Sequence, residues 1–322
     1  MEEGAGDEPV IRAVDDDGGH GDAVQVVAHE VVVGQASHRA HVGVGVRMSL
    51  PSHPRAVITG AGSGLGRALC EELARRRARV LVTDINAASA EETALRVTRA
   101  GGEAHVHVCD VTEPAQVEAM ADAAEQALGG VDLLVNNAGV VSAGPVGELS
   151  LSEWKRVLDI NLWGVIHGCH VFVPRMRRQG SGHILNIASA AGLVYVPDLA
   201  AYNVSKAGVI ALSETLHAEL KATGIGVTVA CPSFFRTRIA STGHYTKDTL
   251  RTLAGLMLDE ARLGPEVVAR RLLKAVDARS LYTVPMADAR WGWRLRRMAP
   301  SLFLRAVAAM NPSARAWLLR RR

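Results

Sequence analysis

The stretch that decides the fold is AVITGAGSGLG, residues 56–66. It opens with a short apolar run typical of a buried strand, and we expect a helix to begin near Arg67. The glycines between them would let a pyrophosphate approach backbone N–H groups at the positive end of the helix dipole, because no Cβ stands in the way. Plain tight turns are also rich in glycine, so the position directly after a strand is what favours a nucleotide site.

Further strand-like runs follow this loop and alternate with helical patterns. They are residues 80–82, 104–108, 133–135, 183–187 and 227–229. Buried runs separated by helices indicate parallel strands joined by crossovers. Helix boundaries are indicated by the capping-box pair Ser150 and Glu153, by Gly224 as a stop and by Pro265 as a first-turn residue. We therefore predict an α/β fold with a single Rossmann-type, doubly wound parallel sheet of about seven strands and helices on both faces.

Composition narrows the class of protein. The chain has 322 residues, of which 48% are hydrophobic and 21% charged, enough for one large α/β domain, and its net charge of +3 does not favour a nucleic-acid partner. Its four cysteines form no CxxC pair, and its histidines lack partners at ligand spacing, so we predict neither disulfides nor a metal site. Without an unbroken apolar run of about eighteen residues, and with an acidic start, a cytoplasmic location is expected.

Three regions are predicted along the chain. Residues 1–50, rich in Gly, Val, His and Asp, are expected to be a disordered or non-native leader, with Met48 as the alternative start. Residues 51–289 form the predicted dinucleotide-binding catalytic domain. Residues 290–322 mix Trp and Leu with Arg, a basic amphipathic extension. Such an extension fits peripheral contact with an anionic membrane, or a helix packed over the pocket or against a sister subunit.

A carboxylate at the end of the second strand bears on the choice of cofactor. Asp84 follows the glycine-rich loop by about twenty residues, where it can accept hydrogen bonds from the adenosine ribose and would repel a 2′-phosphate. This favours NAD, with NADP as the alternative. Asp84 could instead merely cap the next helix. The sequence has no GxxxxGK[ST] motif, which disfavours a P-loop nucleotidase.

Tyr202 and Lys206 lie at i and i+4, hence on one face of a helix. A tyrosine pKa near 10 must fall by roughly three units to approach neutrality, and a neighbouring ammonium and a cationic nicotinamide both act in that direction. Ser189 ends the preceding strand, where it could hydrogen-bond a substrate oxygen or simply cap a turn. Asn161 lies in an apolar helix, where a buried amide needs a water or a backbone carbonyl as partner and suggests a relay.

In combination these motifs resemble the short-chain dehydrogenase/reductase family over about residues 53–285. The family's TGxxxGxG is similar to residues 59–66, its Asp-Val to residues 110–111 at the adenine ring, and its NNAG to residues 136–139 beneath the cofactor. The resemblance implies cofactor contacts at Gly60, Ser63, Gly64, Leu65, Gly66, Asp84, Asp110, Val111, Asn137, Ala138, Gly139, Tyr202, Lys206, Pro232 and Thr237.

The family's Asn-Ser-Tyr-Lys tetrad resembles Asn161, Ser189, Tyr202 and Lys206. This implies that Tyr202 is the acid/base, Lys206 binds the nicotinamide ribose and lowers the pKa of Tyr202, Ser189 orients the substrate oxygen, and Asn161 holds a water in the proton path. In one departure, residues 232–233 read Pro-Ser where the family usually has Pro-Gly. Because Thr237 still matches the residue expected near the carboxamide, we expect cofactor binding to be kept with a differently shaped loop.

Residues 239–262 lie where the family carries a mobile substrate loop, and their apolar residues favour a small lipophilic alcohol or ketone, such as a steroid, a retinoid or a long-chain compound. An apolar stripe is also typical of core or of a subunit contact. The predicted reaction interconverts a secondary alcohol and a ketone with NAD(H), in a homodimer or homotetramer by resemblance. Alternatives are an NADP(H) ketoreductase and a catalytically silent cofactor-sensing protein. A methyltransferase on a related sheet would not explain Tyr202 and Lys206.

Overall fold

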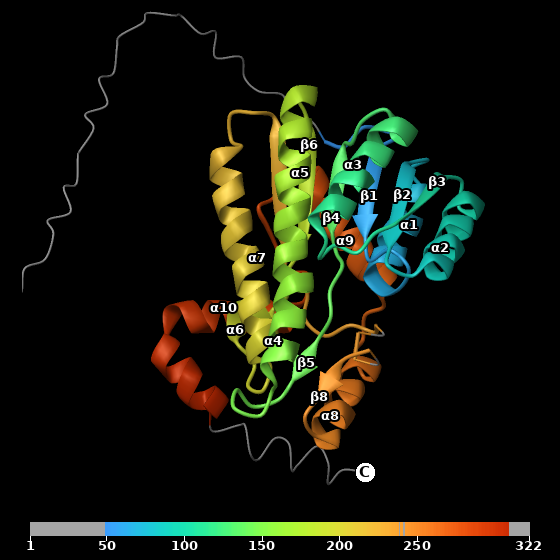
Figure 1. Ribbon diagram of the computed structural model, residues 1–322. Helices are drawn as coiled ribbons and strands as arrows, with labels where there is room; N and C mark the ends of the chain where they lie inside the picture. The colour runs from blue at the N-terminus through green and yellow to red at the C-terminus, as the bar shows by residue number, and fades with distance from the viewer. Residues whose placement is uncertain (1–48, 238, 241, 309–322) are drawn as a thin grey trace, which may run out of the picture. The chain divides into compact units, whose positions relative to one another are not determined.

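The computed structural model describes residues 49–237, 239–240 and 242–308 (Figure 1). Its central sheet has seven parallel strands in the order β3-β2-β1-β4-β6-β7-β9. The strands are β1 Arg55–Thr59, β2 Arg79–Asp84, β3 Glu103–Val108, β4 Leu133–Asn136, β6 Gly182–Ile187, β7 Ile225–Ala230 and β9 Tyr282–Thr283. The predicted α/β class and doubly wound sheet are confirmed. The predictions for residues 1–48 and 309–322 lie outside the described residues.

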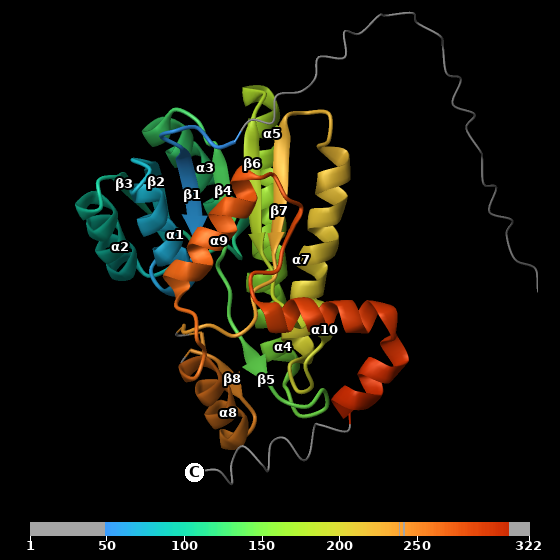
Figure 2. The same cartoon turned by 180° about the vertical axis from the view of Figure 1, so that it is seen from behind.

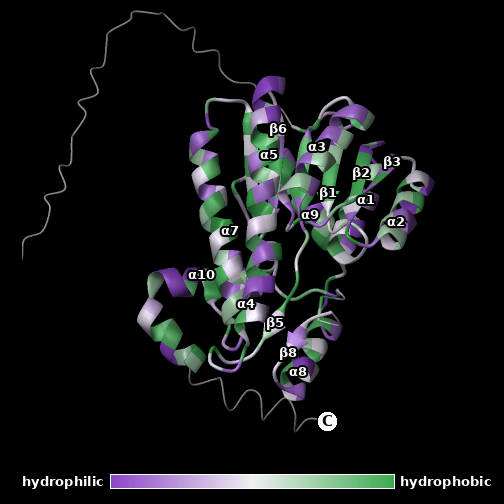
Figure 3. Ribbon diagram, in the orientation of Figure 1, coloured by the Kyte–Doolittle hydropathy of each residue, from purple (hydrophilic) through white to green (hydrophobic). Residues whose placement is uncertain are grey.

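Helices cover both faces of the sheet. One face, toward the viewer in Figure 1, carries α3 (Pro114–Leu128), α5 (Gly164–Gln179) and α7 (Ala200–Glu219). The other face, toward the viewer in Figure 2, carries α1 (Gly64–Ala74), α2 (Ala87–Arg99) and α9 (Pro265–Asp277). Two clusters of buried apolar side chains fill the layers between sheet and helices, and Figure 3 shows the strands as largely hydrophobic. The inner strands therefore read as continuous apolar runs rather than as alternating ones.

Local capping explains where several helices begin. Ser150 Oγ accepts a hydrogen bond from the Glu153 N–H (3.3 Å) at the start of α4 (Leu151–Leu158), as the sequence predicts. Pro265 occupies the first turn of α9, where its missing N–H costs nothing. Helix α1 begins at Gly64, before the predicted Arg67, because the glycine-rich loop itself supplies the first turn.

A continuous helical stretch from Leu151 to Gln179 joins α4 to α5 through a π-helical turn, η1 (Asp159–Trp163). Among the described residues it is the one helix long and apolar enough to cross a membrane by length and composition. However, 44% of its most apolar window is buried inside the fold, and Phe172 is fully enclosed. In this structure the stretch serves as a core helix of the α/β layer.

Several short elements near the carboxyl edge of the sheet are not predicted from the sequence. A two-stranded parallel sheet pairs β5 (Ser142–Ala143) with β8 (His244–Tyr245), directly before α8 (Asp248–Asp259). The short helix α6 (Ala191–Val194) follows β6, and α10 (Ala287–Met298) continues into a second helical segment over residues 300–308. The predicted domain boundary between residues 289 and 290 falls inside α10. Two-residue strands show no periodicity in a sequence, so pattern analysis cannot detect them.

Candidate active site

A cavity of about 1110 Å³ lies at the carboxyl edge of the sheet. It opens beside β1 and β4, where the strand order reverses, the usual ligand position in a doubly wound sheet. Its walls include all of the predicted cofactor residues except Gly66, and three of the four predicted catalytic residues, Ser189, Tyr202 and Lys206. The structure therefore gathers the motifs that lie far apart in the sequence into one site.

The glycine-rich loop has the shape of a cradle for a phosphate group. Gly60 and Gly64 have φ angles of +62° and +53°, a left-handed conformation that favours glycine. Among the described residues no side chain caps the N-terminus of α1, so its first N–H groups are suited to bind an anion. Gly66 differs from the other predicted cofactor residues because it does not line the cavity. A Cβ there would lie 2.3 Å from the Gly60 carbonyl oxygen, so Gly66 allows close packing of loop and helix behind the cavity wall.

Asp84 lines the cavity at the end of β2. Its Oδ2 accepts a hydrogen bond from the Gly62 N–H (2.8 Å), and its Oδ1 accepts one from the Asn86 N–H (2.9 Å). The cap of α2 is Asn86, whose Oδ1 accepts from the Ser89 N–H, so the alternative in which Asp84 caps this helix is wrong. Asp84 instead fixes the glycine-rich loop and presents a carboxylate to the cavity.

Residues 137–139 are locked against the loop by reciprocal hydrogen bonds. Asn137 Nδ2 donates to the carbonyl oxygens of Thr59 (2.9 Å) and Gly60 (3.0 Å). In return, Thr59 Oγ1 accepts from the N–H groups of Asn137 (3.0 Å) and Ala138 (3.1 Å). The ends of β1 and β4 thus hold each other in register under the cavity. In the sequence, Thr59 is recognisable only as the first residue of the glycine-rich motif, and no pattern indicates this bridging role.

Asn161 is fully buried in η1 and does not line the cavity. Its Oδ1 accepts from the Val140 N–H (2.8 Å), and its Nδ2 donates to the Val140 carbonyl (2.9 Å) and to Ser205 Oγ (3.2 Å). The backbone partner expected for a buried amide is therefore present. A π-helical turn of this kind often marks a functional position. Here it directs the amide at the backbone that follows Gly139, while the predicted water in the proton path stays a prediction.

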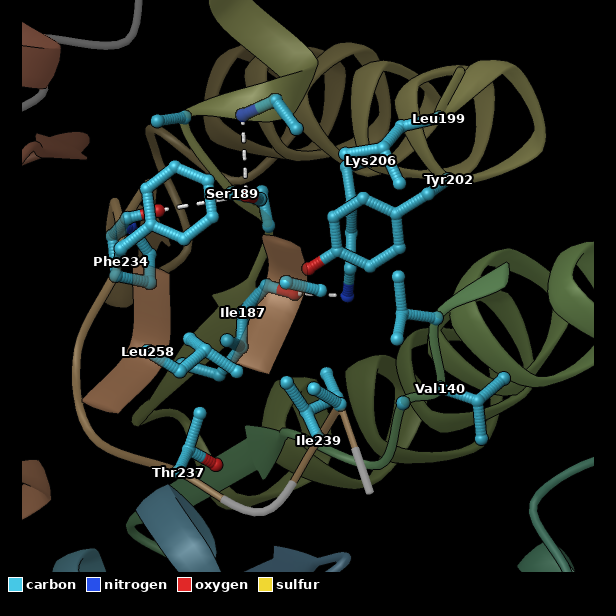
Figure 4. Close-up of a pocket in the computed structure, with 18 of the residues that line it drawn as sticks. Val140, Ile187, Ser189, Leu199, Tyr202, Lys206, Phe234, Thr237, Ile239 and Leu258 are labelled. Atoms are coloured by element: carbon cyan, nitrogen blue, oxygen red, sulfur yellow. Dashed lines mark hydrogen bonds between the residues drawn. The ribbon is translucent and has the colours of Figure 1, made fainter. Parts of the chain in front are cut away.

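Tyr202 and Lys206 project from α7 toward Ser189, which follows β6 (Figure 4). Lys206 is 3% exposed, its Nζ donates to the Ile187 carbonyl (2.8 Å), and it lies 5.8 Å from the centre of the Tyr202 ring. Ser189 Oγ accepts from the Ala191 N–H (3.1 Å) and donates to the Pro232 carbonyl (3.5 Å). The hydroxyl, the ammonium and the phenol thus converge on one wall of the cavity.

Burial dominates the pKa values of this group. It lowers the pKa of Lys206 to about 8, because few surrounding dipoles replace the water around the ammonium. Burial raises the pKa of Tyr202, and a hydrogen bond with Ser189 lowers it by a smaller amount. The predicted lowering of the Tyr202 pKa is thus not produced by the chain's own groups. It requires further positive charge in the cavity.

The substrate side of the cavity has apolar walls. Part of the predicted substrate loop contributes: Ile239, Leu250, Leu253, Met257 and Leu258 line the cavity. Leu250 and Leu258 are also almost fully buried, so they serve as core and wall together. Residues 194–196 line the cavity as well, whereas Leu193 lies in the core.

Ser233, which departs from the Pro-Gly pair usual in the family, forms a hydrogen bond with α10. Ser233 Oγ donates a hydrogen bond to Asp288 Oδ2 (2.7 Å). Helix α10 then packs on α6, where the Arg296 guanidinium lies 3.8 Å from the centre of the Tyr195 ring and donates to the Leu193 carbonyl. One alternative for the basic extension was a helix packed over the pocket. Its described part, residues 290–308, has this position.

Several wall residues escaped the sequence analysis. They are Phe234, Asp288, Phe303 and Val307. No motif marks them, since each reaches the cavity through the tertiary packing of a loop or of the C-terminal helices. The tryptophans and arginines of residues 290–297 drew attention to this part of the chain, but not to Phe303 or Val307.

Comparison with known proteins identifies the family of the chain. A family model described as short chain dehydrogenase matches residues 54–247. The chain belongs to the short-chain dehydrogenase/reductase family, as the motifs predicted. The relatives that it matches are named as oxidoreductases and dehydrogenases, and the chain spans less than half the length of the first of them.

A relative called "Probable oxidoreductase EphD", from Mycobacterium tuberculosis, is 37% identical over 228 residues, which cover 68% of this chain and 38% of the relative. D-threitol dehydrogenase of Mycolicibacterium smegmatis is 39% identical over 196 residues, 60% of this chain and 73% of that one. The chain is also similar to the crystal structure of a Burkholderia phymatum short-chain dehydrogenase/reductase in complex with NAD. That match has a TM-score of 0.74 and 34% identity, and covers 78% of this chain and 95% of that one.

Proposed function

We propose that the protein interconverts a lipophilic secondary alcohol and the corresponding ketone with NAD(H). The observation that carries this proposal is the convergence of Ser189, Tyr202 and Lys206 on the wall of the cavity that also holds the glycine-rich loop and Asp84. The cradle at Gly60 and Gly64 and the uncapped start of α1 fit a dinucleotide. When bound, the nicotinamide would supply or accept the hydride.

The chain's own residues handle the proton. Ser189 hydrogen-bonds the substrate oxygen and holds it beside the Tyr202 hydroxyl. Tyr202 takes the proton from the alcohol or returns it to the ketone oxygen. Lys206, held by the Ile187 carbonyl, favours the tyrosinate through its positive charge. Because burial opposes ionisation of both groups, the positive charge of an oxidised cofactor in the same cavity supports the tyrosinate further.

Asp84 supports NAD rather than NADP as the cofactor. Its carboxylate faces the cavity beside Ile85 and Ser89, where a 2′-phosphate would meet a negative charge. Among the described residues that line the cavity, Lys206 is the one Lys or Arg, and it lies at the catalytic wall. The runner-up, an NADP(H) ketoreductase, would need a cation near Asp84.

Steady-state turnover with NAD(H) and NADP(H) tests this choice. The parent should prefer NAD(H), and Asp84→Ala should lose most of the preference. Asp122→Ala, an exposed aspartate on α3, serves as the control and should keep it. A parent that turns over faster with NADP(H) would contradict the assignment.

The apolar walls support a lipophilic substrate, although one relative is named for a polyol. A cofactor-coupled absorbance screen should compare steroids, retinoids, aliphatic secondary alcohols and acyl ketones with D-threitol. Turnover confined to D-threitol would overturn the lipophilic assignment. Tight NADH binding with no turnover on any compound would support the catalytically silent alternative. The cytoplasmic location and the homo-oligomeric state stay predictions.

A further inference from the structure

Helix α10 presents an apolar stripe to solvent. Trp291, Leu295 and Met298 follow the spacing i, i+4, i+7 and therefore lie on one side of the helix. They are 69%, 49% and 84% exposed. Beyond the break at Ala299, Leu302 and Leu304 are also exposed, on the two flanks of the next helical segment. We call the exposed apolar side chains of residues 291–304, namely Trp291, Leu295, Met298, Leu302 and Leu304, the Trp291 face. Elsewhere in the described chain, large exposed apolar residues do not gather so densely along a helix.

A basic stripe runs beside the apolar one, and Figure 3 shows hydrophilic and hydrophobic residues side by side along α10. Arg290, Arg294 and Arg297 repeat the same spacing one residue earlier, and all three are exposed. Residues 287–308 contain five arginines and one aspartate. Among the described residues, no carboxylate pairs with Arg294 or Arg297, which instead stack on Trp291 (5.5 Å) and Trp293 (5.6 Å).

The inner side of the same helix is fixed to the protein, so the outward direction of the Trp291 face is set. Trp293 packs against Tyr282 with ring centres 5.0 Å apart, and Arg296 stacks on Tyr195. Asp288 is held by Ser233 at the start of the helix. With these contacts in place, α10 cannot rotate to bury its apolar stripe without losing its contacts to α6 and β9.

We propose that the Trp291 face binds the surface of an anionic lipid bilayer. Tryptophan and aliphatic side chains on one side of a helix insert at the boundary between headgroups and acyl chains, while adjoining guanidinium groups bind phosphates. Charge complementarity favours this partner over a second copy of the chain. A two-fold interface would place each copy's unpaired arginines opposite those of the other, which is repulsive.

Lipid binding by the Trp291 face would place the pocket next to the bilayer. Gly292, Phe303 and Val307 line the cavity from the inner side of the segment whose outer side forms the Trp291 face. Binding would hold this wall of the cavity at the membrane surface, where apolar compounds concentrate. That consequence rests on the proposed lipophilic substrate, whereas the lipid contact itself does not.

Sedimentation of the full chain with vesicles, without cofactor or substrate, tests the proposal. The parent should sediment with phosphatidylcholine vesicles that contain phosphatidylglycerol and stay in solution with phosphatidylcholine alone. Changing Arg294 or Arg297 to Gln should weaken the binding about fivefold each, the effect expected for one basic residue at an anionic surface. The triple variant Trp291→Glu, Met298→Glu and Leu302→Glu should lose binding.

A matched triple variant changes three apolar residues of similar exposure elsewhere: Leu95→Glu, Val146→Glu and Leu151→Glu, at 59%, 67% and 85%. It should sediment like the parent. NADH fluorescence and thermal unfolding report whether each variant folds. If the first triple variant fails to fold, the conservative Trp291→Phe replaces it. Brominated phosphatidylglycerol chains should then quench the tryptophan fluorescence of the parent more than that of the variant.

Three results would overturn the proposal. The parent could stay in solution with anionic vesicles, or the Trp291-face variant could sediment as the parent does, which would place binding elsewhere in the chain. Alternatively, ultracentrifugation could show that the variant breaks an oligomer while the parent binds no vesicles, which would make the face a contact between copies. A lack of turnover on every substrate would contradict the proposed function, but it would not change the vesicle sedimentation or the tryptophan quenching.

Discussion

The two halves of the cavity are built in different ways. In the cofactor half, backbone groups and short polar side chains meet over small distances, as where Thr59 and Asn137 exchange hydrogen bonds beneath the glycine-rich loop. In the substrate half, apolar side chains from residues 194–196, 239–258 and 289–307 meet through tertiary packing. A binding surface made from backbone is encoded by consecutive residues, whereas one made from side chains is spread along the chain.

The largest expected effect is on kcat, and it distinguishes a tyrosine that transfers a proton from one that only packs in the cavity wall. Tyr202→Phe should lower kcat by about 10²–10⁴-fold, because the proton donor and acceptor is lost, while NADH binding persists. Tyr245→Phe is the matched control, since Tyr245 lines the substrate half and its hydroxyl donates to the Ala240 carbonyl (3.1 Å). Its kcat should stay close to that of the parent. Similar kcat values for the two variants would contradict the role of Tyr202.

A second test uses the pH dependence of stability. Because burial lowers the Lys206 pKa from 10.5 to about 8, the unfolded chain binds more protons than the folded chain between these values. The cost of burying the charged form is full below pH 8 and is relieved as the pH rises toward 10.5. Relative to Lys206→Met, the free energy of unfolding should therefore rise by about 3 kcal/mol over this range. The free energies of unfolding are measured by urea denaturation at each pH. If they change with pH in the same way for the parent and for Lys206→Met, the prediction of a buried ammonium is contradicted.

Glycine substitutions compare the two halves directly. Gly66→Ala should lower the free energy of unfolding by about 1–3 kcal/mol and weaken NADH binding, because its Cβ would meet the Gly60 carbonyl oxygen. Gly255→Ala lies within α8, and no heavy atom lies within 4 Å of its Cβ position. It should stabilise the protein by up to about 1 kcal/mol through helix propensity. Equal effects of the two substitutions on thermal unfolding would contradict the difference in packing between the two halves.

The smallest effect concerns the link between the loop after β7 and α10. Ser233→Gly restores the Pro-Gly pair that is usual in the family and removes the hydrogen bond to Asp288. Because this bond is exposed, the loss should be about 0.5–1 kcal/mol in unfolding free energy. Asp288→Ala should have a similar effect, and the double variant should add little to either. Strictly additive losses would show that the two side chains act separately.

The sequence predicted the cofactor half well because its signals are local. Gly60, Gly64 and Asp84 line the cavity as expected, and the spacing of Tyr202 and Lys206 brings both side chains to one helix face. Gly66 was predicted to contact the cofactor, but it packs behind the cavity wall, because a motif does not distinguish contact with a ligand from close packing. In the absence of a cofactor, burial raises the pKa of Tyr202, and the extent of this burial cannot be read from residue spacing.

For the substrate half, the sequence predicted the apolar nature of the wall but not all of the residues that form it. The apolar residues of 239–262 indicated a lipophilic wall, and several of them line it. Phe303 and Val307 were missed because their place depends on the break at Ala299 and on the docking of α10. Strands β5 and β8 have two residues each, too few to leave a pattern.

The pairing of those two strands connects the cofactor half of the cavity to the substrate half. Ser142 and Ala143 follow the cofactor-facing residues 137–140 closely, and they pair with His244 and Tyr245 at the start of the substrate loop. A nucleotide that restrains the first segment also restrains the edge on which the second segment forms its hydrogen bonds. Part of the entropy of ordering the loop would then be lost before the substrate arrives, so we expect the substrate to bind more tightly to the nucleotide complex than to the free protein. Four residues of backbone pairing thus predict ordered addition, with the nucleotide first.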